Sequence, residues 1–124
     1  MCPRNQERYT TEQLVTEIFV RDIRRSAGFH RQLGFELVRD AGTFMELAWE
    51  GHRLFLDKRP DADGPTETPV ANVRVMVPDV DRYWDLALGL NALVIAPVAD
   101  RDYGLRDFTV ADPDGYGVRF ASLL

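Results

Sequence analysis

The chain has 124 residues, of which 45% are apolar and 28% are charged, with a formal net charge of −5. This length and balance predict one soluble globular domain with a core of its own. The acidic charge argues against a nucleic-acid partner, and no apolar run is long enough to cross a bilayer. Residues 1–11 are polar, which predicts a flexible N-terminus without a signal peptide. The single cysteine, Cys2, excludes an internal disulfide and favours the cytoplasm.

The first half of the chain alternates between strand and helix patterns. A strand is predicted over 14–20, followed by a helix over 24–33 that Asp22 caps and Gly34 ends. Polar and glycine-containing turns then separate three short predicted strands, over 35–39, 43–49 and 53–57. Together these elements form one βαβββ module, over residues 12–59.

The second half repeats this order after a linker over 60–69, which is rich in proline and acidic residues and cannot form a packed element. Val20-Arg21-Asp22 and Val77-Pro78-Asp79 each end a strand and start a helix, which outlines an internal repeat. The second module, over 70–124, is predicted to contain strands over 70–77 and 93–97, a helix over 78–88 that Gly89 ends, and a closing hairpin.

The closing hairpin runs from Gly104 to Phe120 with the sequence GLRDFTVADPDGYGVRF. Phe108 and Val110 alternate with polar neighbours, the period of a half-buried strand, and the returning strand alternates in the same way. Between the strands, Asp112-Pro113-Asp114-Gly115 has the chemistry of a tight turn. This pattern resembles the closing hairpin of the vicinal-oxygen-chelate superfamily, which includes glyoxalase I, extradiol dioxygenases and bleomycin-resistance proteins.

The resemblance covers roughly residues 12–123 and implies an α+β fold. Two βαβββ modules would form curved mixed sheets, each with a helix on its convex face and a concave pocket on the other side. Residues 12–124 would then be a single glyoxalase/bleomycin-resistance-like domain. The resemblance also implies a homodimer, because proteins of this fold cover the exposed edges of their sheets by pairing modules. Pairing within one chain and exchange across two chains through the linker both remain open.

In the catalytic members of this superfamily, four residues of the concave face hold one divalent metal. The resemblance places these positions at Val15, Phe55, Asn72 and Arg119. Valine and phenylalanine offer no lone pair, arginine offers only positive charge, and asparagine is a weak neutral ligand. We therefore predict no metal and no other cofactor. A shift of two residues along the strands would bring Glu17 into the concavity together with Asp57, so an atypical metal site is an alternative.

The predicted concave faces mix aromatic side chains with a few charges, as small-molecule pockets do. The predicted ligand-binding residues are Glu17, Phe19, Phe44, Glu46, Phe55, Asn72, Arg74, Tyr103 and Arg119. The aromatic members would stack on a flat ligand, and Arg74 or Arg119 would suit a carboxylate or phosphate. Glu17, Glu46 and the acidic linker instead favour a cation.

Two further residues carry expectations about packing. A buried arginine needs a partner, and we expect Arg119 to pair with Glu17 or Asp57 in the empty protein. His30 is predicted to pack on the convex side of the first sheet rather than to bind a ligand.

These features favour a metal-free small-molecule binding protein of the bleomycin-resistance type. It would sequester an aromatic compound or antibiotic in the cytoplasm of a bacterium. The alternative is a superfamily enzyme, namely a lyase, isomerase or dioxygenase, with an atypical metal site or with Glu17 as base. A third reading is an interaction domain whose concavity is filled by its own side chains. The identity of the ligand and the question of catalysis stay open at this stage.

Overall fold

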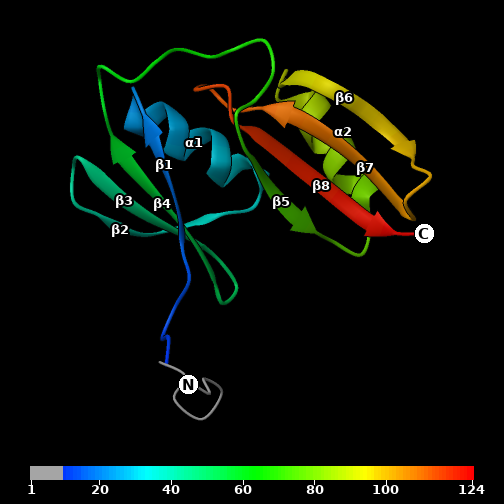
Figure 1. The fold of residues 1–124 in the computed structure, drawn as a ribbon, viewed down its shortest axis with the longest axis horizontal. Coiled ribbons are helices and arrows are strands. Elements are labelled where there is room, and N and C mark those ends of the chain that lie inside the picture. Colours follow the sequence, from blue (N-terminus) through cyan, green and yellow to red (C-terminus); the bar gives the residue numbers. More distant parts are fainter. Residues whose placement is uncertain (1–9) are drawn as a thin grey trace, which may run out of the picture.

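The computed structural model describes residues 10–124, so Cys2 and most of the predicted N-terminal segment lie outside the described residues. Within this range the chain forms two four-stranded sheets, and one helix packs against each sheet (Figure 1). None of the helices in residues 10–124 is long and apolar enough to cross a membrane.

The first module occupies the N-terminal half of the described chain. Its elements are β1 (Thr16–Val20), α1 (Ile23–Leu33), β2 (Glu36–Asp40), β3 (Phe44–Trp49) and β4 (His52–Lys58). The strand order is β1-β4-β3-β2, with β1 parallel to β4 and the other pairs antiparallel. Asp22 caps α1 as predicted, because its carboxylate accepts a hydrogen bond from the Arg25 backbone N–H at 3.2 Å.

The second module repeats the same order. Its elements are β5 (Asn72–Met76), α2 (Val80–Gly89), β6 (Leu93–Asp100), β7 (Leu105–Ala111) and β8 (Gly117–Leu123), and the strand order is β5-β8-β7-β6. The predicted α+β fold of two βαβββ modules is therefore confirmed. The predicted end of the second helix was wrong, since Gly89 is still helical. The chain reverses at Asn91, whose φ is 57°, because asparagine tolerates the left-handed conformation.

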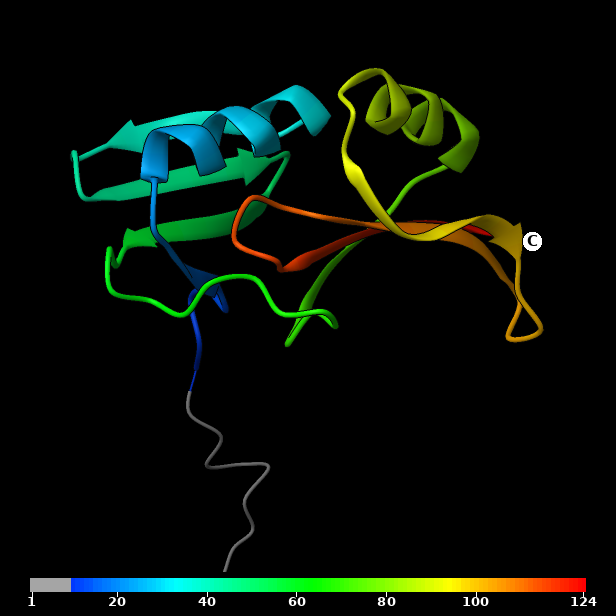
Figure 2. The same cartoon turned by 90° about the horizontal axis from the view of Figure 1, so that it is seen from above.

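Both helices lie on one side of the two sheets, which leaves the opposite face of each sheet uncovered (Figure 2). We call the uncovered faces the module-one and module-two open faces. Strand alternation sorts the side chains between the two sides. Ile18 and Phe120 are buried on the helix side, whereas Phe19 and Arg74 are exposed on the open faces. Neighbouring residues of a strand therefore face opposite sides of the sheet, one toward the helix and the next toward the open face.

The cores of the two modules meet at Trp49, at the end of β3. Its ring packs against Phe35 of the first module at a centroid distance of 5.3 Å. It also packs against Tyr83 and Phe120 of the second module, at 5.7 and 6.0 Å. Aromatic packing of this kind holds the two modules in one body.

The turn at residues 112–115 fastens the second module to the first. Asp114 Oδ1 accepts hydrogen bonds from the backbone N–H and the Nε–H of Arg21, both at 3.0 Å. Gly115 has a φ of 88°, and a Cβ there would lie 2.8 Å from Pro65 Cα in the linker. Glycine adopts this positive φ without strain, and it has no Cβ to collide with Pro65. The motif that predicted a hairpin is thus also the joint between the modules.

Candidate functional site

Three phenylalanines lie on the module-one open face. Phe19 on β1 is 44% exposed, and the guanidinium of Arg59 lies 4.7 Å from its ring centroid. Phe44 and Phe55 meet edge to face with their centroids 5.1 Å apart. Phe55 is also the register partner of Glu17 on β1. The face therefore offers aromatic rings next to a carboxylate, which is the chemistry of a site for flat organic molecules.

Most of the charge on the module-one open face is paired within the chain. Glu46 Oε2 accepts a hydrogen bond from Arg53 Nε at 2.9 Å, and Asp57 Oδ2 accepts one from Arg59 Nη2 at 3.1 Å. Glu17 is exposed, and no ion pair to it forms within residues 10–124. The preference for a cationic ligand expected from the acidic residues is therefore weaker than their number suggests.

Asp107 on β7 is the centre of the module-two open face. Its side chain is fully buried, and Oδ1 accepts a hydrogen bond from Arg101 Nε at 2.8 Å. Oδ2 accepts from the Tyr103 hydroxyl at 2.7 Å and from Arg119 Nε at 3.3 Å. Arg119 Nη2 donates in addition to the Tyr103 hydroxyl oxygen at 2.6 Å. These four side chains form one connected network, which fixes the Arg119 guanidinium in place.

The network also sets the protonation states of its members. Burial raises the pKa of Asp107, but the hydrogen bonds from Tyr103 and Arg101 and the positive charges of Arg119 and Arg101 outweigh it, so this pKa lies below its ordinary value. The same hydrogen bond to Asp107, reinforced by burial, raises the pKa of Tyr103. At neutral pH Asp107 is therefore a carboxylate and Tyr103 a phenol, which makes Tyr103 a hydrogen-bond donor rather than a base.

The expected partners of Arg119 were wrong. Arg119 pairs with Asp107, at 3.2 Å between Nη2 and Oδ2, and neither Glu17 nor Asp57 pairs with it. The reason is topological, because Asp107 lies on β7, the antiparallel neighbour of β8, whereas Glu17 and Asp57 belong to the other sheet. The alternation that buries Phe108 could have identified Asp107, since it places the preceding residue on the open face.

The sequence-predicted ligand residues fall into two groups, one on each open face. The module-one group contains Glu17, Phe19, Phe44, Glu46 and Phe55, and the module-two group contains Asn72, Arg74, Tyr103 and Arg119. The structure brings together the members of each group. Within one chain it does not merge the two groups into one site, because they lie on separate sheets (Figure 1).

The residues at the implied metal positions do not fit a divalent metal. Val15 and Phe55 have no donor atom, and Arg119 is committed to Asp107 and Tyr103. The side-chain oxygen of Asn72 lies directly over Gly117, at a place where any Cβ would collide with it. Residues 10–124 contain no group of three or more histidine, cysteine, aspartate or glutamate side chains arranged to hold a metal ion.

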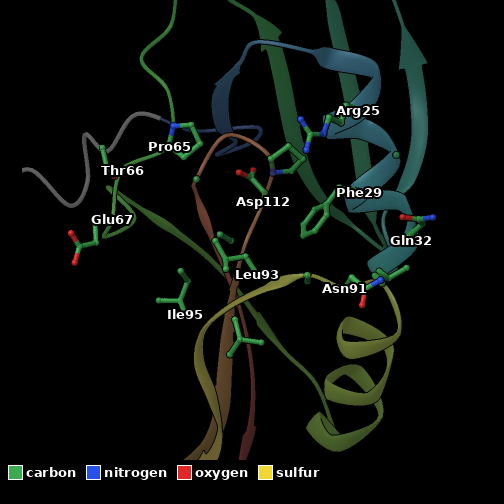
Figure 3. A pocket seen from close by; sticks show the side chains of 17 residues that line it. Arg25, Phe29, Gln32, Pro65, Thr66, Glu67, Asn91, Leu93, Ile95 and Asp112 are labelled. Carbon is green, nitrogen blue, oxygen red and sulfur yellow. The ribbon is translucent and has the colours of Figure 1, made fainter.

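A cleft of about 940 Å³ lies at the junction of the modules. Figure 3 shows it between α1, the linker, the start of β6 and the turn at residues 112–115. Phe29, Leu93 and Ile95 contribute apolar walls, and Arg25 and Glu67 stand on opposite sides. None of the sequence-predicted ligand residues lines this cleft. It is a second place where a small molecule could be held.

Comparisons with known proteins support the same fold. Residues 12–120 match the sequence model of the family described as Glyoxalase/Bleomycin resistance protein/Dioxygenase superfamily. Curated proteins give no significant match to the chain.

Several solved structures are similar to this one. TioX from Micromonospora sp. ML1 is 22% identical, with a TM-score of 0.76 over 92% of this chain and 100% of that one. A glyoxalase/bleomycin resistance protein/dioxygenase from Nocardioides is 16% identical, with a TM-score of 0.75 over 97% of this chain and 89% of that one. A bleomycin-binding protein complexed with bleomycin is 19% identical, with a TM-score of 0.73 over 92% of this chain and 100% of that one. At such identities the likeness shows the fold alone.

Proposed function

The chain belongs to the Glyoxalase/Bleomycin resistance protein/Dioxygenase superfamily, and we propose that it is a metal-free binding protein that sequesters an aromatic compound or antibiotic in the cytoplasm. The observation that carries this proposal is the aromatic group of Phe19, Phe44 and Phe55 on an open sheet face whose metal positions lack metal-binding side chains. Partly exposed rings gain by stacking on a flat ligand. The solved complex of a bleomycin-binding protein with bleomycin supports small-molecule capture on this fold.

We further propose that the binding unit is a homodimer. The open faces leave large apolar side chains in solvent, with Phe19 44%, Met76 51% and Leu123 80% exposed. Phe19 lies on the module-one open face, and Met76 and Leu123 lie on the module-two open face, so each face offers apolar surface to a partner. A second copy is the occupant that the superfamily resemblance implies, because pairing modules across two chains covers exposed sheet edges. Light scattering tests this: the proposal predicts twice the chain mass of 14.1 kDa, and a stable 14.1 kDa particle contradicts it.

Calorimetric titration after dialysis against EDTA tests ligand capture. Metal-free bleomycin is the first probe, followed by a panel of aromatic antibiotics. The proposal predicts saturable binding of at least one compound and a higher Tm, because a ligand that binds only the folded state stabilises it. Phe55→Ala should weaken that binding, while Phe29→Ala in the junction cleft serves as the matched control and should not.

Two outcomes would contradict this function. Binding that appears only after Mn²⁺, Zn²⁺ or Ni²⁺ is restored would show that a metal is required. Chemical conversion of the bound compound, abolished by Glu17→Gln, would support the enzyme alternative with Glu17 as base.

A further inference from the structure

Positive charge exceeds negative charge on the module-two open face. Three arginines, Arg74, Arg101 and Arg119, lie on it or at its rim, and Asp107 is the carboxylate that contacts two of them. Arg101 lies at the rim, directly after β6, where Nε donates to Asp107 and Nη2 donates to the Pro97 carbonyl oxygen at 2.6 Å. Arg74 and Arg119 are the two arginines that lie side by side on paired strands of this face.

Arg74 and Arg119 lie directly opposite each other. They are register partners on the parallel strands β5 and β8, with their side chains on the same face. Like charges directly opposite each other in a sheet destabilise the pairing. Arg74 is exposed and forms no ion pair within residues 10–124, and the Arg119 side chain keeps 22% of its surface in solvent. This pair of cations lacks a full countercharge in the part of the chain that is described.

Asp107 cannot supply the missing charge. Its carboxylate already accepts hydrogen bonds from Arg101, Tyr103 and Arg119, and it shares one negative charge between two guanidinium groups. The paired carboxylates Glu46 and Asp57 belong to the other sheet and are held there by their own arginines. None of these carboxylates is therefore available to neutralise the Arg74–Arg119 pair.

We propose that the Arg74–Arg119 pair is an anion subsite that binds an oxyanion of the ligand, namely a carboxylate, a sulfonate or a phosphate. Guanidinium groups present parallel N–H donors that match two oxygens of such a group. The assignment of this oxyanion to an aromatic ligand rests on the proposed function. The subsite itself rests on the arginine geometry, and it replaces the cation preference expected from the acidic residues.

The test uses three probes at constant ionic strength, because screening would otherwise alter the affinities. They are naphthalene-2-carboxylate, its neutral analogue naphthalene-2-carboxamide, and inorganic phosphate, which lacks a ring. Dissociation constants come from NMR titrations that follow the arginine Nε–Hε signals. We expect the carboxylate to bind more tightly than the carboxamide, and phosphate to shift the Arg119 signal. Arg119→Gln and Arg74→Gln should each weaken carboxylate binding about tenfold and leave carboxamide binding unchanged.

Arg82→Gln is the matched control, since it removes the same charge from an exposed position of α2 and should change nothing. Arg74→Gln keeps the test informative if Arg119→Gln fails to fold, because Arg74 is exposed. The subsite is overturned if neither phosphate nor the carboxylate shifts the arginine signals, or if the carboxylate preference survives both substitutions. The subsite is also overturned if phosphate shifts the arginine signals only in Glu17→Gln. That result would show that Glu17 of a second copy, and not a ligand, pairs with these arginines in the wild-type protein. Phosphate binding without binding of either naphthyl probe would contradict the proposed function and leave the subsite standing.

Discussion

His30 Nε2 lies 3.6 Å from Asp112 Oδ2, and both side chains are fully buried. Neither atom has a hydrogen-bond partner within residues 10–124. His30 Nδ1 lies 2.8 Å from the Ser26 carbonyl oxygen, so the ring proton belongs on Nδ1 and Nε2 of the neutral ring is an acceptor. Asp112 Oδ1 accepts the N–H groups of Asp114 and Tyr116, both at 2.9 Å. His30 Nε2 and the Asp112 carboxylate oxygen Oδ2 are thus two buried acceptors that face each other. A hydrogen bond between them, which would link α1 to the 112–115 turn, requires one proton on either group.

Protonation of this pair is linked to folding. Burial raises the pKa of Asp112 to about 6, against the backbone hydrogen bonds that lower it, and the charge of Asp114 adds to the increase. Burial lowers the pKa of His30, although the Ser26 hydrogen bond and Asp114 oppose this. Because the folded-state pKa is raised, the protonated Asp112 carboxyl contributes to the free energy of unfolding at low pH. This contribution is lost as pH rises through about 6. The His30 contribution has the opposite sign and is lost as pH falls through its folded pKa.

Asp112→Asn isolates the carboxyl contribution. An amide can donate to His30 Nε2 while its oxygen keeps the two backbone hydrogen bonds, and it does not titrate. We expect the variant to gain stability relative to wild type as pH rises. The gain in unfolding free energy between pH 4.5 and pH 8 should be about 2 kcal/mol, from a pKa raised from 3.8 to about 6. Urea unfolding at a series of pH values measures it. Asp79→Asn is the control, because Asp79 caps α2 without a side-chain hydrogen bond. If the unfolding free energies of both variants depend on pH in the same way, the link between Asp112 protonation and folding is refuted.

Arg119→Glu and Arg74→Glu should have different effects on stability although they change charge equally. A glutamate at 119 places a second carboxylate beside buried Asp107 and removes its partner, which should lower the unfolding free energy by about 2 kcal/mol. A glutamate at 74 faces Arg119 instead, so the unfolding free energy should stay unchanged or rise by up to about 1 kcal/mol. Chemical denaturation checks both. Equal losses in the two variants would show that the Asp107 network is not what holds Arg119.

Added Zn²⁺ or Mn²⁺ should not restore the stability of Arg119→Glu. The position would then carry a carboxylate, but Val15 and Phe55 still offer no donor atoms. A metal-dependent rise in Tm for this variant, and none for wild type, would show that the remaining positions can complete a metal site.

Gly115→Ala should weaken the joint between the modules. An alanine there must adopt a φ of 88° and place its Cβ 2.8 Å from Pro65 Cα, so we expect a loss of about 2 kcal/mol in unfolding free energy. Gly28→Ala is the matched control, because at this exposed position of α1 no atom outside the neighbouring residues and the helix's own backbone lies within 4 Å of a Cβ. It should raise stability by about 0.5–1 kcal/mol. Equal stability of the two variants would contradict the packing of the turn against the linker.

The fold could be predicted because its signals are local. The strand around Phe108, the cap at Asp22 and the Asp112–Gly115 turn each depend on neighbours within a few residues, and each appears in the structure. The strand differs from the prediction in one respect, since it is buried continuously from Asp107 to Ala111 instead of at alternate positions. The end of α2 was misplaced because Gly89 and Asn91, two residues apart, both suit a helix end, and local sequence does not choose between them.

The candidate site was harder to predict because its contacts are not local. Arg21 and Asp114 are 93 residues apart in sequence, so nothing in the hairpin motif indicates that its second aspartate binds the first module. The pairing of Arg119 depends on which strand lies next to β8, and this is a property of topology. Strand alternation could have placed Asp107 on the open face, but only the structure shows that its side chain is buried and shared by two arginines.

Binding of an aromatic molecule on the open faces without a metal is the central claim, and chemical-shift mapping tests it most directly. Backbone amide spectra of EDTA-treated protein are recorded during a titration with naphthalene-2-carboxylate. We predict that the largest shifts lie around Phe19 and Phe55 on the module-one open face and around Arg119 on the module-two open face. Shifts confined to Phe29 and Ile95 in the junction cleft, or shifts that require added Zn²⁺, would contradict the claim.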